Sequence, residues 1–265
     1  MADHFRLYCH YYSLCSVMVR FSNALVRPFP KERLQIEEQI IDIQHGGQLT
    51  EEYLCEINHL GTVPVLAGKT LERSLTDSLD ITVFLAERYL PTLMPTHIAD
   101  QSRSLLEEIH DINYFSLTYT HKEHRVAEMQ DAMKAACSNP DMSDRHRKAL
   151  EDKLQVAISS QLPALSNELV VEAEEKTLKL LAKLEQILMQ SEQQSQTPSP
   201  WLFGTQEATA LDGHVVPFLA RLLDVGRGEM LGRKDSRLHR YVEAAYETEA
   251  WKEIVGDRTT VYAGF

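Results

Sequence analysis

Hydrophobic positions change their spacing partway along the chain. Up to residue 93, short apolar runs typical of strands alternate with segments in which apolar residues recur at helical spacing. From residue 97 onward the helical spacing predominates, and no strand-like alternation remains. The pattern predicts an α+β fold, with a mixed domain at residues 1–93 and an all-helical domain at residues 97–265.

Apolar runs and capping residues predict the elements of the first domain. Thr50 and Asp77 each precede a helical segment, where a short oxygen-bearing side chain accepts hydrogen bonds from free N–H groups. The predicted order is β-α-β-α-β-β-α, which needs both crossover and hairpin connections. Strands are expected at residues 5–9, 34–43, 63–66 and 70–71, and helices at 16–26, 50–58 and 77–89.

Prolines divide the second domain. Pro140 and Pro163 are expected to end helices, because proline lacks the N–H that an internal helical position needs. The polar segment 191–200 predicts a loop. Further helices are expected at 201–223, 238–246 and 251–255. Residues 176–190 have an amphipathic pattern suited to domain packing or, as a second interpretation, to a dimer contact; the apolar face consists of Leu178, Leu181, Leu184 and Leu188.

Charge and hydropathy exclude several classes of function. The net charge is -12, and the basic segment 233–240 is interrupted by acidic and apolar residues. We interpret that segment as a solvated helix face and expect no nucleic-acid binding, which needs clustered Lys and Arg. No apolar run reaches the roughly 18 residues that a membrane span needs, and the N-terminus lacks the pattern of a secretion signal. A cytoplasmic protein without membrane contact is expected.

Cysteine and histidine spacings do not predict a metal site. The cysteines form no CxxC pair, which is typical of reduced thiols rather than of disulfides or structural zinc; they are Cys9, Cys15, Cys55 and Cys137. His121 and His124 have HxxH spacing without a third ligand, so a polar helix surface is the preferred interpretation. No metal is expected.

Two motifs in the first domain indicate a site for a small peptide. Pro64 begins a predicted strand, and a cis Val63–Pro64 bond would present the Val63 backbone to an extended ligand; an ordinary edge-strand proline is the alternative. Asp77 and Ser78 begin a predicted helix, whose free N–H groups attract a carboxylate. Together the motifs suit a peptide with an amino-acid end.

The start of the first predicted helix offers hydroxyl and thiol groups. Ser13, Cys15 and Ser16 lie where a helix N-terminus stabilises a thiolate, either their own or that of a ligand. The serines are also suited to be N-caps, and Cys15 to be a small buried apolar residue. Both interpretations remain open at this point.

The order and spacing of these motifs resemble those of glutathione transferases. Residues 57–66 (INHLGTVPVL) resemble the N-P-x-G-x-V-P-x-L loop of that family, with His59 in place of the usual proline. Residues 77–81 (DSLDI) resemble its E/Q/D-S-x-A-I element, with Asp80 in place of alanine. Residues 46–50 (GGQLT) resemble its G-E-H-L-S segment.

Further resemblances extend over the rest of the chain. Residues 13–20 (SLCSVMVR) are similar to the S-S-C-S-x-x-V-R motif of the zeta class, with Leu14 replacing the second serine. Residues 119–190 resemble the extended helical region of the ganglioside-induced differentiation-associated branch and of fungal transferase-like proteins. Thr209 and Asp212 resemble the family's capping box, a folding device. Replacing Asp212 with Ala is expected to cost roughly 1 kcal/mol or more of stability.

The resemblance implies a thioredoxin-like first domain that binds glutathione as a co-substrate. The resemblance favours Ser13 as the residue that holds the glutathione thiolate. Cys15 is the alternative, and Ser16 is a further candidate in the same turn. It implies glutathione contacts at Gln48, Val63, Pro64, Asp77 and Ser78. It places the pocket for a hydrophobic electrophile between the domains, near Tyr12, Tyr114 and Tyr119. A homodimer is also implied.

The implied function is a glutathione transferase that adds the glutathione thiolate to an electrophilic small molecule, in detoxification or secondary metabolism. Cys15 leaves open a mixed-disulfide chemistry of the thioltransferase or dehydroascorbate type. Two further alternatives remain. One is a glutathione-dependent cis-trans isomerase of maleyl-type substrates, and the other is a non-catalytic protein that binds glutathione or another ligand.

Overall fold

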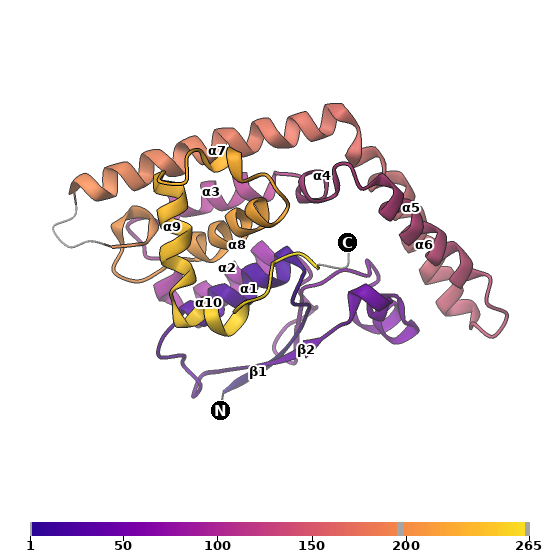
Figure 1. The fold of residues 1–265 in the computed structure, drawn as a ribbon. Coiled ribbons are helices and arrows are strands. Elements are labelled where there is room, and N and C mark those ends of the chain that lie inside the picture. The colour runs from indigo at the N-terminus through magenta and orange to yellow at the C-terminus, as the bar shows by residue number, and fades with distance from the viewer. Residues whose placement is uncertain (1, 195–198, 263–265) are drawn as a thin grey trace.

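A computed structural model describes residues 2–194 and 199–262. Figure 1 shows a small layer of strands beneath a body of helices, and a pair of helices that leaves this body at one side. The first domain and the helical domain follow each other in the chain as the hydrophobic spacing predicts. The architecture is thioredoxin-like followed by all-α.

The sheet has three strands in the order β2-β1-β3. The central strand β1 (Asp3–Cys9) pairs in parallel with β2 (Leu34–Ile40) and antiparallel with β3 (Val65–Gly68). The predicted strand at residues 70–71 is wrong. Leu71 N donates to Gly68 O in a turn, and Leu75 forms an isolated bridge with Leu66 instead. The polar residues 72–74 delay the next apolar side chain until Leu75, which packs against the main core.

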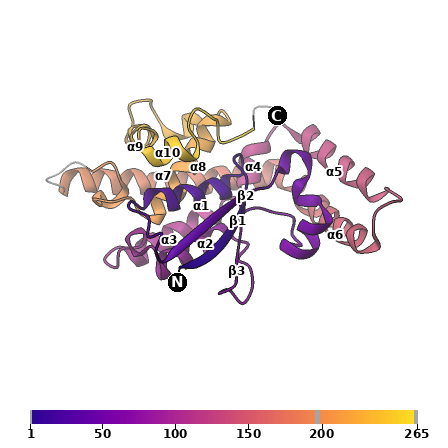
Figure 2. The same ribbon diagram turned by 90° about the horizontal axis from the view of Figure 1, so that it is seen from below.

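Helices cover both faces of the sheet to different extents. In Figure 2 the strands lie in front of α1 (Leu14–Leu25) and α2 (Ser78–Arg88), which bury one face. On the other face, the predicted helix at residues 50–58 is a π-helix over Tyr53–Ile57, preceded by Thr50, whose hydroxyl accepts from Tyr53 N at 3.3 Å. The Tyr53 ring packs edge-on against Tyr8, with centroids 6.2 Å apart.

The helical body surrounds α8 (Ala210–Asp224), which is buried along most of its length. Around it lie α3 (Ala99–His110), α4 (Tyr114–Tyr119), α7 (Asn167–Gln194), α9 (Arg237–Tyr246) and α10 (Glu249–Ile254). Gly213 allows α8 to approach α1, because a Cβ there would lie 2.1 Å from Ser22 Oγ. The two domains therefore share one continuous core. Within the described residues, no helix combines the length and apolar character needed to cross a membrane.

Two boundaries in the helical domain differ from the prediction. The helix expected at 201–223 begins only at Ala210, because Thr209 caps it and residues 202–204 form a short 3-10 turn. The loop expected at 191–200 is helical up to Gln194, and its residues 195–198 lie outside the described residues. In the predicted stripe of α7, Leu181, Leu184 and Leu188 are buried, whereas Leu178 is exposed.

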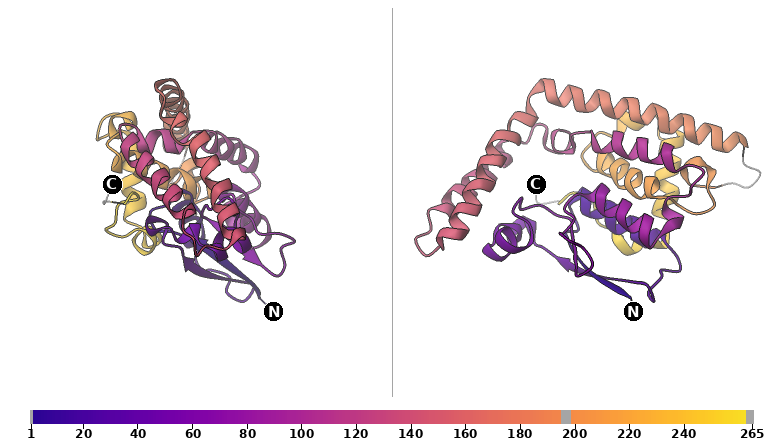
Figure 3. Two further views of the ribbon diagram at one scale, coloured as in Figure 1. Left: turned by 90° about the vertical axis from the view of Figure 1, so that its right-hand side faces the viewer. Right: turned by 180° about the vertical axis from the view of Figure 1, so that it is seen from behind.

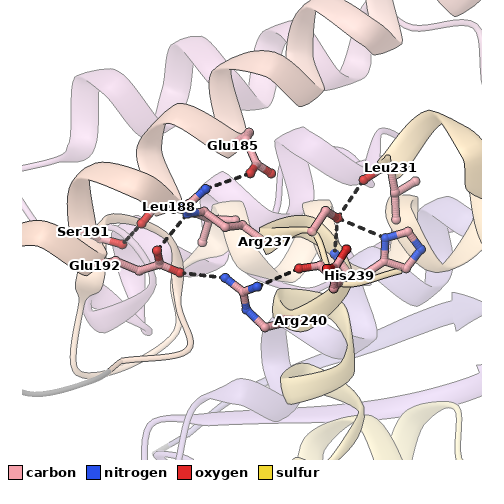
Figure 4. A network of polar contacts seen from close by, with 10 residues as sticks. Glu185, Leu188, Ser191, Glu192, Leu231, Arg237, His239 and Arg240 are labelled. Atoms are coloured by element: carbon pink, nitrogen blue, oxygen red, sulfur yellow. Dashed lines mark hydrogen bonds and ion pairs between the residues drawn. The ribbon is translucent and has the colours of Figure 1, made fainter. Parts of the chain in front are cut away.

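Ion pairs hold the end of α7 against α9, as Figure 4 shows. Arg237 pairs with Glu192 at 2.7 Å and with Glu185 at 3.3 Å, and Arg240 pairs with Glu192 at 3.3 Å. The basic segment 233–240 is therefore more than a solvated helix face, because two of its arginines contact the acidic residues of α7. These contacts help explain why the helix continues past residue 190.

The extra helical region forms a protruding hairpin, which we term the helical arm. It consists of α5 (Glu123–Cys137) and α6 (Asp144–Ser160), with Pro140 in the connection and Pro163 opening the turn that follows. Figures 1 and 3 show the arm leaving the helical body and running down beside the first domain. Leu54 of the first domain joins a small separate core with arm residues Met133, Leu150, Leu154 and Ala157.

Candidate functional site

A cavity of about 720 Å³ lies between the first domain and the helical arm. It is lined by Ser13, Gln48 and Val63, three of the residues that the sequence predicts to bind glutathione. The arm supplies a mostly apolar wall that includes Met129, Met133, Met142 and Leu150, together with His146, Lys153 and Gln161. These three residues therefore face a surface that the predicted site did not include. The other predicted glutathione contacts, Pro64, Asp77 and Ser78, are not among the residues that line the cavity.

Ser13 is placed at the cavity by its role as the N-cap of α1. Its Oγ accepts a hydrogen bond from Ser16 N at 3.3 Å and donates to Val63 O at 3.4 Å. The second distance is long for a hydroxyl donor, so this hydrogen bond is weak. A thiolate in the cavity would be a stronger acceptor, and the Ser13 hydroxyl can turn to it at little cost.

Hydrogen bonds fix the backbone before Val63, whereas the backbone groups of Val63 itself are largely unpaired among the described residues. The Val63–Pro64 peptide bond is cis. Tyr53 Oη and Asn58 Nδ2 donate to Thr62 O at 2.8 and 2.9 Å, which fixes the segment before Val63. Within the described residues the Val63 N–H has no recorded partner, and Val63 O accepts only the weak bond from Ser13. An extended ligand would find a donor and an acceptor here.

The start of α2 places Asp77 and Ser78 side by side. Asp77 is exposed and caps the helix, accepting from Leu79 N at 2.8 Å and from Asp80 N at 3.1 Å. Ser78 is only 2% exposed, and its Oγ has no hydrogen-bond partner of ordinary geometry. The capping role expected of Asp77 is confirmed, while the Ser78 hydroxyl is buried next to the Cys15 thiol.

Cys15 and Ser16 do not line the cavity, in contrast to Ser13. Burial raises the pKa of the Cys15 thiol, and the neighbouring Ser78 hydroxyl and Arg221 guanidinium lower it only in part. At neutral pH Cys15 is therefore a thiol and a poor nucleophile. Ser16 is fully buried, and its Oγ has no partner.

Buried polar atoms without partners gather around the cavity and the start of α1. They are Gln48 Oε1, Gln161 Oε1, Ser78 Oγ, Ser16 Oγ and His10 Nδ1, with Ser102 Oγ as a further case. Buried polar atoms in folded proteins are nearly always hydrogen-bonded. Gln48 and Ser78 are also two of the predicted glutathione contacts. Their unsatisfied atoms indicate that a polar ligand or water belongs at this place.

Known proteins resemble this chain in structure but not detectably in sequence. No protein-family model and no curated protein sequence matches the chain. Glutathione transferase F2 from Populus trichocarpa matches with a TM-score of 0.58 and 16% identity, over 94% of this chain and 96% of the poplar chain. The chain has the glutathione transferase fold.

Two further matches carry glutathione or a derivative. A glutathione transferase homologue from Sulfitobacter, solved with bound glutathione, has a TM-score of 0.57 and 15% identity over 95% of this chain and 97% of its own. A maleylacetoacetate isomerase from Anaeromyxobacter dehalogenans, with bound dicarboxyethyl glutathione and citrate, has a TM-score of 0.53 and 18% identity over 97% of this chain and 93% of its own.

Within this glutathione transferase fold, the three predicted electrophile-site tyrosines do not line the cavity. The Tyr12 ring packs against Tyr262, with centroids 5.3 Å apart, and Tyr119 stacks on Phe115 at 4.5 Å. Tyr114 Oη donates to Ile109 O at 2.7 Å, and burial raises its pKa well above the usual value. The apolar wall that shares the cavity with Ser13 comes from the arm instead.

Sequence reasoning missed Arg221, a buried arginine on α8. It donates to Tyr12 O at 2.9 Å and to Thr260 Oγ1 at 3.1 Å, and so ties the residue before Ser13 to the C-terminal segment. Burial lowers its pKa, and within the described residues no carboxylate forms an ion pair with it. The sequence showed only an arginine in the last turn of a predicted helix, which is a common surface position.

The described residues contain no cluster of three or more His, Cys, Asp or Glu side chains arranged to hold a metal ion. His121 and His124 lie at the start of the arm, apart from the cavity lining. The polar groups in the cavity lining are hydroxyl, amide, backbone, imidazole and ammonium groups.

Proposed function

We propose that the protein binds glutathione in this cavity and holds the glutathione thiolate at Ser13 for addition to an electrophilic small molecule. The observation that carries the proposal is the convergence of Ser13, Gln48 and Val63 on one cavity. Gln48 in the cavity lining and Ser78 at the start of α2 also carry buried polar atoms without a hydrogen-bond partner of ordinary geometry among the described residues. The fold is that of proteins solved with glutathione bound.

The proposed binding mode follows the three parts of glutathione. The cysteinyl backbone pairs with the N–H and C=O of Val63, ahead of Pro64. The γ-glutamyl end lies at Asp77 and Ser78, and the glycine end lies near Gln48. The sulfur then sits at the N-terminus of α1, where the Ser13 hydroxyl and the helix dipole both stabilise a negative charge.

In the proposed reaction the thiol loses its proton to solvent and the thiolate attacks the electrophile. A sulfur–carbon bond forms, and with an aryl halide the halide leaves with the electron pair of its bond. Ser13 is assigned the role because it lines the cavity, whereas Cys15 does not line it and has a thiol whose pKa is raised by desolvation. We propose a hydrophobic acceptor, since methionines and Leu150 form much of the arm wall.

A second candidate is cis-trans isomerisation of a maleyl-type double bond by reversible thiolate addition. The similarity of residues 13–20 to the zeta-class motif favours it, as does the likeness to a solved maleylacetoacetate isomerase. A protein that binds glutathione without turnover is the third candidate. A homodimer in the cytoplasm remains a proposal under each of them.

The test is to titrate glutathione calorimetrically, then to assay conjugation of an aryl halide and isomerisation of a maleyl acid. We expect Ser13→Ala to retain glutathione binding and to lower kcat/KM by about 100-fold, the usual cost of removing a hydrogen-bond donor to developing charge. Cys15→Ser should leave turnover close to that of the wild type.

Ser236→Ala is the matched control, because Ser236 is also a helix N-cap whose Oγ accepts from a backbone N–H, that of His239, at 3.3 Å. It should cost stability like any lost cap but no activity. Full turnover by Ser13→Ala would show that Ser13 does not hold the thiolate. Binding without either activity would favour the third candidate, and no binding at all would refute the proposal.

A further inference from the structure

Lys153 reaches from the helical arm to the first domain. Its Nζ donates to Leu60 O at 2.6 Å. Its Cε lies 3.3 Å from the position that a Cβ on Gly61 would occupy, and Gly61 has a φ of +56°, a conformation that favours glycine. The aliphatic stem therefore packs on Gly61, and the ammonium group lies at the cavity wall close to the segment that leads into Val63.

Among residues 2–194 and 199–262, no carboxylate forms an ion pair with Lys153. Other arm lysines have one, since Lys134 pairs with Asp131 at 3.0 Å and Lys148 pairs with Asp152 at 3.9 Å. In the described part of the chain, the recorded polar contact of Lys153 is the carbonyl of Leu60. Burial lowers the pKa of its ammonium group. A partly buried, unpaired cation is costly, and an anion beside it would offset that cost.

The described residues that line the cavity carry no acidic side chain. The protein has a net charge of -12, yet neither Asp nor Glu is found among the described residues that line this cavity. Besides Lys153, the lining includes Gln48 and Gln161, whose buried Oε1 atoms have no partner. Oxygen and nitrogen of an amide are interchangeable by rotation, so either glutamine can present an N–H donor instead. The ammonium group of Lys153 and the two amide groups together are suited to bind a carboxylate.

We propose that Lys153 binds the glycine carboxylate of glutathione, so that the helical arm completes the glutathione site. This inference rests on the proposed function and adds a residue to it. Lys153 and Gln48 both lie close to Gly61, because a Cβ at this position would lie 3.3 Å from Lys153 Cε and 3.3 Å from Gln48 O. With the cysteinyl backbone at Val63 and the glycine end near Gln48, as proposed above, the glycine carboxylate lies in the part of the cavity that Lys153 also lines.

The test compares glutathione with its glycine monoethyl ester, which lacks the charge at that end. Binding is measured by titration calorimetry for the wild type, Lys153→Met and Lys153→Gln. We expect the wild type to prefer glutathione by about tenfold or more, as is typical of a hydrogen-bonded charge pair. Both variants should bind the two ligands with nearly equal affinity, close to that of the wild type for the ester.

Lys148→Met is the matched control, since Lys148 is on the same helix with a side chain that is 80% exposed. It should keep the wild-type preference. Lys153→Gln retains a donor for Leu60 O, so it remains informative if Lys153→Met does not fold. Unchanged preference in folded Lys153 variants would overturn this inference and leave the proposed function standing. Failure of the wild type to bind either ligand would refute the proposed function itself.

Discussion

Ser13 and Cys15 lie two residues apart at the start of α1, and their surroundings give them different properties. A helix N-terminus favours an anion at either position. Ser13 lines the cavity, whereas Cys15 is enclosed beside Ser78 and burial raises its pKa. For Cys15 the desolvation penalty outweighs the helix dipole and the nearby Arg221. The sequence alone left both residues open, because burial is a property of the folded molecule.

A hydrogen-bonded histidine pair, His110 partly buried and His214 fully buried, is expected to make stability depend on pH. His110 Nε2 and His214 Nδ1 are 2.8 Å apart, and His214 Nε2 lies 2.9 Å from Thr82 Oγ1. Burial lowers the pKa of both, and that of His214 lies well below the usual value. Their hydrogen bonds join α3, α8 and α2 in the neutral state.

Because the folded-state pKa values are depressed, the unfolded chain takes up protons first as the pH falls below about 6.5. The stabilisation is therefore complete above that pH and is lost below it, by about 1.4 kcal/mol per unit of pKa difference. Chemical unfolding at pH 7.5 and pH 5 should show this loss. In His214→Gln, which does not titrate, the loss should be smaller; an equal loss would contradict the assignment.

At the scale of elements, the capping box at Thr209 and Asp212 that the family resemblance implies is present at the start of α8, although the helix was expected to begin at residue 201. Thr209 Oγ1 accepts from Asp212 N, and Asp212 Oδ2 accepts from Thr209 N at 2.7 Å. The tertiary structure adds contacts that the motif does not contain. Leu202 N and Tyr241 Oη also donate to Asp212 Oδ1, at 2.9 and 2.8 Å.

The added contacts change the expected cost of Asp212→Ala. Loss of a cap alone costs about 1 kcal/mol, but the substitution leaves several buried donors without an acceptor, so we expect about 3 kcal/mol or more. Urea unfolding monitored by circular dichroism measures the difference. Asp212→Asn keeps one acceptor oxygen and should lose less. Equal stabilities of the Ala variant and the wild type would contradict the role of the box.

Element boundaries that neither a capping residue nor a clear hydrophobic period marks were predicted less accurately. In place of the strand expected at residues 70–71, Leu75 bridges to Leu66, and α7 extends to Gln194, near whose end Arg237 and Arg240 contact Glu192. Both outcomes depend on residues distant in the chain. Hydrophobic spacing over a short window does not contain that information.

At the scale of the whole molecule, the helical arm is attached to the first domain through a limited set of contacts. Leu54 is 2% exposed and packs in the small arm core. Polar contacts from α6 surround it, since His146 Nε2 donates to Leu49 O at 2.8 Å and Arg145 donates to Cys55 O at 3.1 Å. The width of the cavity is therefore set by this interface.

We expect Leu54→Ala to loosen the arm more than the helical body. Truncating a buried leucine costs about 2 to 5 kcal/mol, and here most of the lost contacts join the arm to the first domain. Hydrogen exchange should accelerate in residues 123–160 before it does so in α8. Leu85→Ala, in the main core, serves as the comparison and should affect both regions. Faster exchange in α8 alone would refute the proposed attachment.

The sequence by itself determined the features that depend on close neighbours in the chain. These include the change from a mixed domain to a helical one, and the caps at Ser13, Asp77 and Thr209, whose bonding partners lie within three residues. It also brought Val63–Pro64 and Gln48 to attention, through their resemblance to a known family. Such features are encoded locally because helical periodicity and capping are local interactions.

Only the tertiary structure decided what faces these residues. The hydrogen bond from Lys153 to Leu60 joins positions 93 residues apart, and nothing in the spacing of either segment predicts it. The same holds for the methionines of the arm that line the cavity, for the desolvation of Cys15 and for the hydrogen bond from Arg221 to Tyr12 O. Contacts of this kind form when distant elements pack on one another, so the shape and charge of the cavity follow from the fold as a whole.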